Sequence, residues 1–359
     1  MPVDDNLPLS AFRPRSMLHV DEHLVDRPRY PVIDMHNHSQ WGEHWQVTDI
    51  DTLIAEMDAA GVAAMVDLDG GNGDRLKTHL ERFRGPYPDR FAIFATCDWA
   101  RHLACDDFGE RIAADLRTAV QAGAEGLKIW KDLGLTWKDN RGRLIALDDE
   151  RLAPLFTTAG ELGVPILIHV ADPMAFFQPL DAANERFEEL SRHPDWHFYG
   201  PGLPSFDALI DQFEAVLERH PSTTFIGAHV ASLAEDLKRA EELLRRRPNL
   251  YVDISARAAE LGRQPHTTRR FLGSMAGRVV FGLDGWPARA RDYRVVYRML
   301  ETSDEYFPYT GDEDAPPGSQ GRWRIYGADV DDASLRALYY ETALHILPRF
   351  RSALEHACH

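Results

Sequence analysis

Val32-Ile33-Asp34-Met35-His36-Asn37-His38 is the stretch that decides how the rest of the chain is interpreted. Val32 and Ile33 are β-branched and apolar, which is typical of a strand buried on both faces. Residues i and i+2 of an extended segment point to the same side, so His36 and His38 can aim both imidazoles at one point. The end of such a strand offers two nitrogen ligands to one metal ion. The alternative for an isolated His-x-His is a pair of solvated loop histidines.

Short apolar runs recur after this stretch, and each has the length of a buried strand. The eight runs cover residues 31–33, 62–66, 91–95, 126–129, 164–168, 224–227, 250–252 and 279–281. Amphipathic stretches long enough for helices lie between them, for example at 48–60, 107–122, 148–162, 205–219 and 233–247. Strands alternating with helices in this way predict an α/β fold, a single-domain (β/α)₈ TIM barrel. A doubly wound open sheet is the alternative, but it would need a Gly-rich phosphate turn after an early strand, and the sequence has none.

The regions outside this repeat predict the domain organisation. Residues 1–30 are rich in Pro, Arg and Asp without clear periodicity, so we expect an N-terminal arm packed on a barrel formed by residues 31–359. Residues 171–204 and 285–330 are too long to be single helices. They follow the fifth and eighth strands, at the end where barrel active sites form, and predict loop insertions at the rim. Surface decoration is the alternative for the second insertion.

Composition excludes several classes of partner. The chain has 57 acidic and 40 basic residues and a formal net charge of -17, which argues against a nucleic-acid or anionic membrane surface. No apolar run reaches the ~18 residues of a membrane span, and the acidic start is not typical of a secretory signal. Three cysteines without metal or redox spacing fit a reducing, cytoplasmic compartment. Whether the protein forms a homo-oligomer stays open.

Polar side chains follow several of the apolar runs at the point where each run ends. They are His36 and His38 after the first run, Lys128 in the fourth, His169 after the fifth, His229 after the sixth and Asp284 after the eighth. The C-terminal ends of the strands of a closed parallel barrel surround one cavity, so we expect these side chains to meet there. Histidines and an aspartate in one cavity predict a metal site.

The motifs around these residues resemble a known family. They are Asp34-Met35-His36-Asn37-His38, Ile168-His169-Val170, Gly227-Ala228-His229-Val230 and Gly282-Leu283-Asp284-Gly285-Trp286. Together they resemble the amidohydrolase superfamily, in particular the family 2 branch of single-domain barrels that includes aminocarboxymuconate-semialdehyde decarboxylase. The similarity covers about residues 30 to 350 and includes a closing helix at 339–347, where Thr342 stands in place of the branch's frequent Asn.

The resemblance implies a role for each of these residues. His36, His38, His169 and Asp284 would bind one divalent ion, most simply Zn²⁺, and a water molecule would complete its shell. His229 would act beside this water as a general base, or as an electrophilic partner for the substrate oxygen. Asp284 would also accept the proton of the water.

Three further residues are expected to bind the substrate, each with an alternative. Lys128 would pair with a substrate carboxylate or carbonyl. In the binuclear relatives a lysine on this strand is carboxylated and bridges two ions, in which case His229 would bind the second ion; an ion pair inside the barrel is a third reading of Lys128. Arg257 would grip a carboxylate in a fork, or form a surface salt bridge. Trp130 would line a ring-sized pocket, or simply pack.

These roles lead to three functional hypotheses. The first is a metal-dependent hydrolase of an amide, cyclic amide or lactone in a small, carboxylate-bearing molecule. The second is a metal-dependent lyase that decarboxylates an aromatic or unsaturated acid without oxidation. The third is a catalytically silent metal-binding protein, in which protein ligands would close the coordination shell.

Overall fold

Eight parallel strands follow one another around one sheet in the computed structural model, which describes residues 6–8, 11–12, 14–41, 45–286, 288–311 and 320–357. In sheet order they are β1 (Val32–Asn37), β4 (Val62–Asp67), β5 (Phe91–Thr96), β6 (Gly126–Ile129), β7 (Ile166–Ile168), β8 (Phe225–Gly227), β9 (Leu250–Asp253) and β10 (Val279–Val280). The first and last strands also meet, because Met35 N–H donates to the Phe281 carbonyl at 2.9 Å and Asp284 N–H to the His36 carbonyl at 2.8 Å. The predicted TIM barrel is therefore confirmed.

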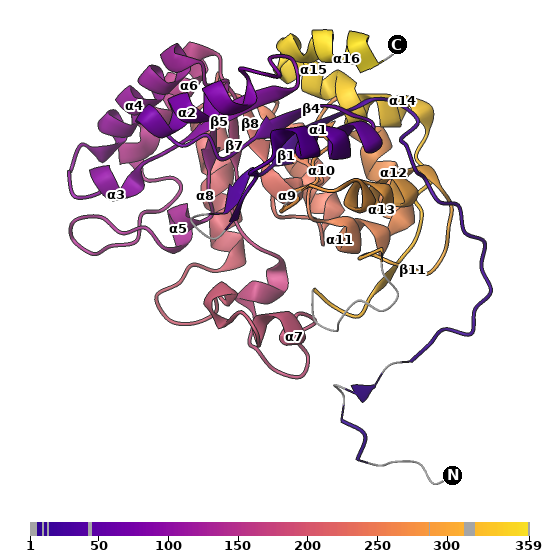
Figure 1. Ribbon diagram of the computed structural model, residues 1–359. Coiled ribbons are helices and arrows are strands. Elements are labelled where there is room, and N and C mark those ends of the chain that lie inside the picture. The colour runs from indigo at the N-terminus through magenta and orange to yellow at the C-terminus, as the bar shows by residue number, and fades with distance from the viewer. Residues whose placement is uncertain are drawn as a thin grey trace.

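Helices cover the outside of the barrel (Figure 1). The longer ones are α1 (Ile50–Ala59), α2 (Gly73–Phe83), α4 (Phe108–Ala122), α6 (Ala153–Leu162), α8 (Phe206–Arg219), α10 (Leu237–Arg246), α12 (Pro265–Ser274) and α13 (Ala290–Glu301). The side chains of Asp49 and Ser205 accept N–H groups at the starts of α1 and α8, which explains why these helices begin where they do.

Shorter elements complete the chain. The short helices are α3 (Trp99–His102), α5 (Asp132–Leu135), α7 (Phe187–Leu190), α9 (Ala228–Ala231), α11 (Ala258–Gly262), α14 (Asp332–Arg336), α15 (Thr342–Ile346) and α16 (Arg351–Ala357), with a π-helical turn at Ala337–Glu341. Two hairpins lie outside the barrel sheet: β2 (Gln40–Trp41) with β3 (Trp45–Gln46), and β11 (Phe307–Pro308) with β12 (Arg324–Ile325).

The apolar core has two layers, one between the strands and the outer helices and one inside the barrel. Ile33, Leu167 and Val280 belong to the inner layer, together with Leu347 and Phe350 from the C-terminal segment. The C-terminal helices therefore close one end of the barrel, and Figure 1 shows α16 at this end and α7 at the opposite one. The site has to lie at the end that is left open.

Segments outside the barrel repeat fall where long loops are expected. Residues 171–204 contain α7 and two 3₁₀ turns, Met174–Phe177 and Pro194–Trp196. Residues 285–330 contain α13 and the β11–β12 hairpin; positions 287 and 312–319 lie outside the described residues. The second interval thus supplies the eighth outer helix as well as part of the rim.

Polar contacts hold the part of the predicted arm nearest to the barrel. The carboxylate of Glu22 lies 2.9 Å from Arg298, and His23 Nδ1 lies 2.5 Å from Asp304 Oδ1. The domain boundary after residue 30 stays a prediction. In the described part of the chain, no helix is both long and apolar enough to cross a membrane.

Candidate metal centre

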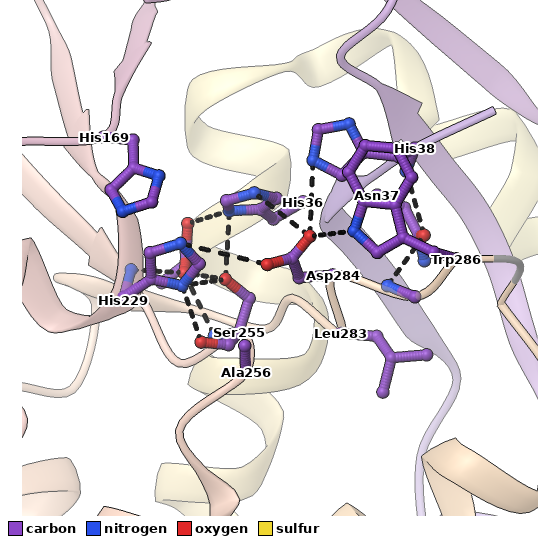
Figure 2. A network of polar contacts seen from close by, with 12 residues as sticks. His36, Asn37, His38, His169, His229, Ser255, Ala256, Leu283, Asp284 and Trp286 are labelled. Atoms are coloured by element: carbon purple, nitrogen blue, oxygen red, sulfur yellow. Dashed lines mark hydrogen bonds and ion pairs between the residues drawn. The ribbon is translucent and has the colours of Figure 1, made fainter. Parts of the chain in front are cut away.

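Three histidines from two strand ends surround the carboxylate of Asp284 (Figure 2). Asp284 Oδ1 lies 3.3 Å from His38 Nε2 and 3.9 Å from His36 Nε2. Its other oxygen, Oδ2, lies 3.9 Å from His229 Nε2. His36, His38 and Asp284 each offer one donor atom, and these atoms lie within 4.8 Å of one another. That spacing is close enough for one ion to contact all three.

His169 reaches the same region from the end of β7. Its ring centroid lies 4.5 Å from that of His229, and Figure 2 shows the two rings side by side. His169 Nε2 is buried and has no hydrogen-bond partner among the described residues; the nearest carboxylate oxygen, Asp172 Oδ1, is 3.5 Å away. A buried imidazole nitrogen without a partner is costly unless something else occupies its lone pair.

Acceptors on the far side of the rings fix the orientation of three imidazoles. His36 Nδ1 lies 2.8 Å from Asp253 Oδ2, His38 Nδ1 lies 3.0 Å from Asp69 Oδ1, and His229 Nδ1 lies 2.8 Å from the Ser255 carbonyl. An Nδ1–H that donates outward leaves the Nε2 lone pair facing the centre, and metal-binding histidines are usually held in this way. The unpartnered His169 nitrogen and these oriented rings together fit a divalent cation.

Electrostatics differ among the histidines. Burial lowers the pKa of His169 to about 4, against the opposing effect of Asp172, so its imidazole is neutral at pH 7. Burial and the nearby Lys128 ammonium also lower the pKa of His36. Burial by itself lowers the pKa of His38 as well, but the carboxylates of Asp69 and Asp284 outweigh it and raise that pKa to about 9. A divalent cation would displace the His38 proton and take its place beside Asp284.

Two residues of the centre have left-handed backbone conformations. His229 has φ 59° and Asp284 has φ 62°, which are unusual for residues other than glycine. Val230, Ala231 and Ser232 continue the left-handed turn that begins at His229. Strain of this kind persists only where surrounding contacts enforce it, and it is frequent at functional sites.

A cavity of about 570 Å³ opens above the donor groups. Lys128 is buried in its wall, where the ammonium lies 3.5 Å from His36 Nε2 and 4.9 Å from the centre of the Trp130 ring. Burial lowers the pKa of Lys128 to about 8, although Asp284 opposes the shift. Arg257 also lines the cavity. Its side chain is buried, since the residue is only 6% exposed, so it does not form the surface salt bridge that was the alternative role.

Aromatic rings form another part of the wall. Trp130 and Trp286 both stack on His38, with centroid distances of 4.9 and 4.0 Å. Trp286 also donates from Nε1 to Asp284 Oδ1 at 3.0 Å. These indoles therefore hold the donor groups in place as well as lining the cavity.

The barrel brings together all of the side chains expected at the strand ends. His36, His38, Lys128, His169, His229, Asp284, Arg257 and Trp130 all line this one cavity. Asp34 points elsewhere: it accepts from Tyr293 Oη at 2.6 Å and from Leu283 N–H at 3.2 Å, so it braces the strand from the outer side. The assignment of particular residues as ligands, base or substrate contacts stays a prediction.

Sequence reasoning missed several polar residues of the site. Asp69 and Asp253 lie at the ends of β4 and β9, so the rule that found the histidines could have found them too. Arg186 carried no such signal, because it comes from the insertion after β7. It is 1% exposed, ion-pairs with Glu260 and lies 2.8 Å from Glu189, and it closes the outer wall of the cavity.

Comparisons with known proteins agree with this geometry. A protein-family model described as amidohydrolase matches residues 33–349. No curated protein gives a significant match.

Similar solved structures share the fold. A dihydroxybenzoic acid decarboxylase from Polaromonas sp. JS666, with bound manganese and the inhibitor 2-nitroresorcinol, superposes with a TM-score of 0.58 at 15% identity, covering 90% of this chain and 99% of that one. A 2,6-dihydroxybenzoate decarboxylase from Rhizobium gives 0.56 at 16% identity, covering 88% and 98%. A putative amidohydrolase from Staphylococcus aureus gives 0.54 at 15% identity, covering 89% and 99%.

Proposed function

Because the chain belongs to the amidohydrolase family, and its histidine and aspartate cluster suits a divalent metal, we propose that it is a metal-dependent decarboxylase of an aromatic carboxylic acid. The reaction is non-oxidative. The C–C bond to the carboxylate breaks, carbon dioxide leaves, and a proton takes its place on the ring carbon.

Two cations that form no ion pair with a carboxylate among the described residues carry this proposal. Within the described residues, Lys128 makes its polar contact with His36, and Arg257 donates to the Ala256 carbonyl at 2.8 Å. Two other cations of the wall are neutralised: the half-buried Lys131 pairs with Asp172, and the buried Arg186 pairs with Glu189. A substrate carboxylate is the anion that would form ion pairs with Lys128 and Arg257.

The aromatic residues in the cavity wall suit a substrate with a planar ring. Trp130 and Trp286 stack on His38 and also line the cavity beside the donor groups, and aromatic rings pack well against indoles. The decarboxylases with the same fold act on dihydroxybenzoates, and the one from Polaromonas holds manganese and a resorcinol derivative. These neighbours support an aromatic acid as the substrate class and leave Zn²⁺ and Mn²⁺ as the two ions to test.

The chain's own groups divide the work of the reaction. A bound divalent ion would supply positive charge that stabilises the anionic substrate, with His36, His38, His169 and Asp284 holding it. Lys128 and Arg257 would hold the carboxylate, and the indole rings would exclude water from it. His229 and Asp284, whose Nε2 and Oδ2 atoms lie 3.9 Å apart, would pass a proton from water in the cavity to the ring carbon.

Hydrolysis of an amide or lactone is the second candidate. It is favoured by the same pair of His229 and Asp284, which could instead take a proton from an attacking water molecule. Under this reading Lys128 and Arg257 would bind a carboxylate that survives the reaction.

One experiment separates these functions. The purified protein, loaded with Zn²⁺ or Mn²⁺, is incubated with a panel of carboxyl-¹³C hydroxybenzoates, and in parallel with lactones and cyclic amides in ¹⁸O-water. We expect ¹³CO₂ from at least one acid, loss of its release after chelation, and loss of its release in His36→Ala. Incorporation of ¹⁸O without any ¹³CO₂ would contradict decarboxylation and support hydrolysis. Stoichiometric metal binding without either product would support the silent metal-binding protein.

A further inference from the structure

Ser255 lies between the two histidines that the proposed function assigns to different tasks. It follows β9 and is fully buried. Its hydroxyl oxygen is 3.0 Å from Nδ1 of His36 and 3.0 Å from Nδ1 of His229. Figure 2 shows Ser255 between the two rings. The same oxygen is 2.6 Å from Asp253 Oδ1. One hydroxyl therefore contacts a candidate metal ligand, the candidate proton carrier and a buried carboxylate.

The hydrogen-bond capacity of these groups decides which way each bond runs. An ionised carboxylate only accepts, so the single proton of the Ser255 hydroxyl goes to Asp253, its nearest partner. The hydroxyl oxygen then has only lone pairs left for the rings. Both imidazoles must therefore carry a proton at Nδ1, where His36 also meets Asp253 Oδ2 at 2.8 Å and His229 meets the Ser255 carbonyl at 2.8 Å.

The backbone around His229 is fixed by the same carboxylate. Asp253 Oδ1 accepts the N–H of His229 at 2.9 Å and the N–H of Ser255 at 3.0 Å. On the other side of the left-handed turn, the Ser232 hydroxyl accepts the Ala171 N–H at 3.0 Å, just beyond His169. These contacts fix the backbone at His229, and the contacts of its Nδ1 then decide how the ring is held and which nitrogen carries the proton.

Resting on the decarboxylase proposal, we propose that Ser255 is a positioning residue, which keeps His229 in the tautomer with the proton on Nδ1. Its hydroxyl and carbonyl oxygens both accept from Nδ1, so the lone pair of Nε2 faces the cavity and Asp284. His229 is then ready to take a proton from the cavity side at Nε2 and to return it there. Asp253 serves His36 in the corresponding way, and the Ser255 hydroxyl couples the two rings to one carboxylate.

This arrangement assigns different consequences to two substitutions. Ser255→Ala removes one of the two acceptors of His229 Nδ1 but leaves His36 on Asp253, so metal binding should survive while turnover falls. In Asp253→Asn the amide oxygen can keep the two backbone N–H groups, which turns its NH₂ group toward His36 Nδ1. His36 would then have to carry its proton on Nε2, and metal binding should be lost.

The test reads the tautomer directly. Zn²⁺-loaded protein labelled with ¹⁵N-histidine is studied by long-range ¹H–¹⁵N NMR, with the His229 signals identified by their loss in His229→Gln. We expect His229 to be protonated at Nδ1 and bare at Nε2. A wild-type His229 protonated at Nε2 would overturn the proposal. This measurement needs no substrate, so it succeeds or fails independently of the decarboxylase assignment.

Kinetics and metal content complete the test. We expect Ser255→Ala to lower kcat about 10- to 100-fold with unchanged KM and metal content, and Asp253→Asn to lose metal. Ser334→Ala is the matched control, because Ser334 is also buried and donates to a carboxylate, that of Asp331 at 2.8 Å, but lies on α14 away from the cavity. Unchanged turnover in Ser255→Ala, with His229 still protonated at Nδ1, would show that Ser255 does not position the ring.

Discussion

Asp69 Oδ1 lies 3.0 Å from His38 Nδ1, across the boundary between β1 and β4. The second oxygen of the same carboxylate accepts the N–H groups of Ser39 at 2.8 Å and Gln40 at 2.9 Å. One side chain therefore fixes both the ring of His38 and the backbone that follows it. Because a carboxylate only accepts, it also commits His38 to present its Nε2 to the metal centre.

Replacing this carboxylate should weaken metal binding. An amide at position 69 can offer an N–H to His38 Nδ1 and so favour the wrong tautomer. We expect Asp69→Asn to lower the affinity for Zn²⁺ about 10- to 100-fold, measured by competition with a chelator of known affinity. Asp74→Asn is the control, since the Asp74 side chain on α2 is 99% exposed. Equal affinities for Zn²⁺ in the two variants would show that Asp69 does not contribute to metal binding.

In the left-handed turn after β8, replacing an alanine with glycine should not lower the stability of the protein, as it usually does inside a helix. Ala231 has φ 53°, which costs about 1–2 kcal/mol for a residue with a Cβ, whereas losing one buried methyl group costs about 0.8 kcal/mol. We expect Ala231→Gly to unfold in denaturant with a free energy equal to or above that of the wild type.

The matched control for this turn is Ala240→Gly. Ala240 is equally buried but lies inside the regular helix α10, where glycine is unfavourable. We expect this variant to lose about 2 kcal/mol, the sum of the propensity and burial costs. A comparable loss in Ala231→Gly would mean that the turn is not strained.

The sequence predicted the scaffold of the site better than its fine structure. Apolar runs located all eight strands to within a few residues, because strands buried on both faces leave a strong hydrophobic signal. Closure of the barrel then converted distant strand ends into neighbours, which is why His169 and Asp284 could be placed beside His36. These two steps depend on local pattern and on topology, and both can be read from sequence.

The rest depends on tertiary contacts without a local signature. The left-handed conformation at His229 is supported by a hydrogen bond to Asp253 on the neighbouring strand, and none of the left-handed residues 229–232 is a glycine. Arg186 enters the cavity wall from an irregular insertion, where neither helical nor strand periodicity applies. Sequence reasoning also could not say that Arg257 is buried and forms no ion pair with a carboxylate among the described residues.

Glu235 should make stability depend on pH. Burial raises the pKa of its carboxyl above 4.5, against the opposing charge of Arg257, and the side chain accepts the Met174 N–H at 3.1 Å. The folded protein therefore holds this proton more tightly than the unfolded chain. The resulting stabilisation is present below pH 4.5 and is lost as the pH rises through the raised value.

Replacing the Glu235 carboxyl with a group that does not ionise should abolish this loss of stability at higher pH. Glutamine keeps an oxygen acceptor for Met174, so we expect Glu235→Gln to gain stability relative to the wild type as the pH rises from 4.5, measured by urea unfolding at several pH values. Glu110→Gln, at an exposed position on α4, should follow the wild-type profile. A constant difference between Glu235→Gln and the wild type across the series would contradict the assignment.

Lys128 should act on substrate binding more than on metal binding. Methionine fills a similar volume without a charge, so we expect Lys128→Met to keep its metal and to raise KM for the carboxylate substrate about 10-fold or more, the loss of one charge-assisted hydrogen bond. The control is Lys77→Met, whose side chain is 63% exposed on α2. An unchanged KM in Lys128→Met would leave the ammonium without a role in carboxylate recognition.

An anomalous-scattering map of crystals grown with Mn²⁺ or Zn²⁺ would show whether these side chains hold a metal ion. We expect one strong peak at the open end of the barrel, within bonding distance of His36 Nε2, His38 Nε2, His169 Nε2 and a carboxylate oxygen of Asp284. A second peak beside a carboxylated Lys128 would replace the single-ion arrangement by a binuclear one. A map in which the cavity holds no peak while the ion saturates the protein elsewhere would contradict the account.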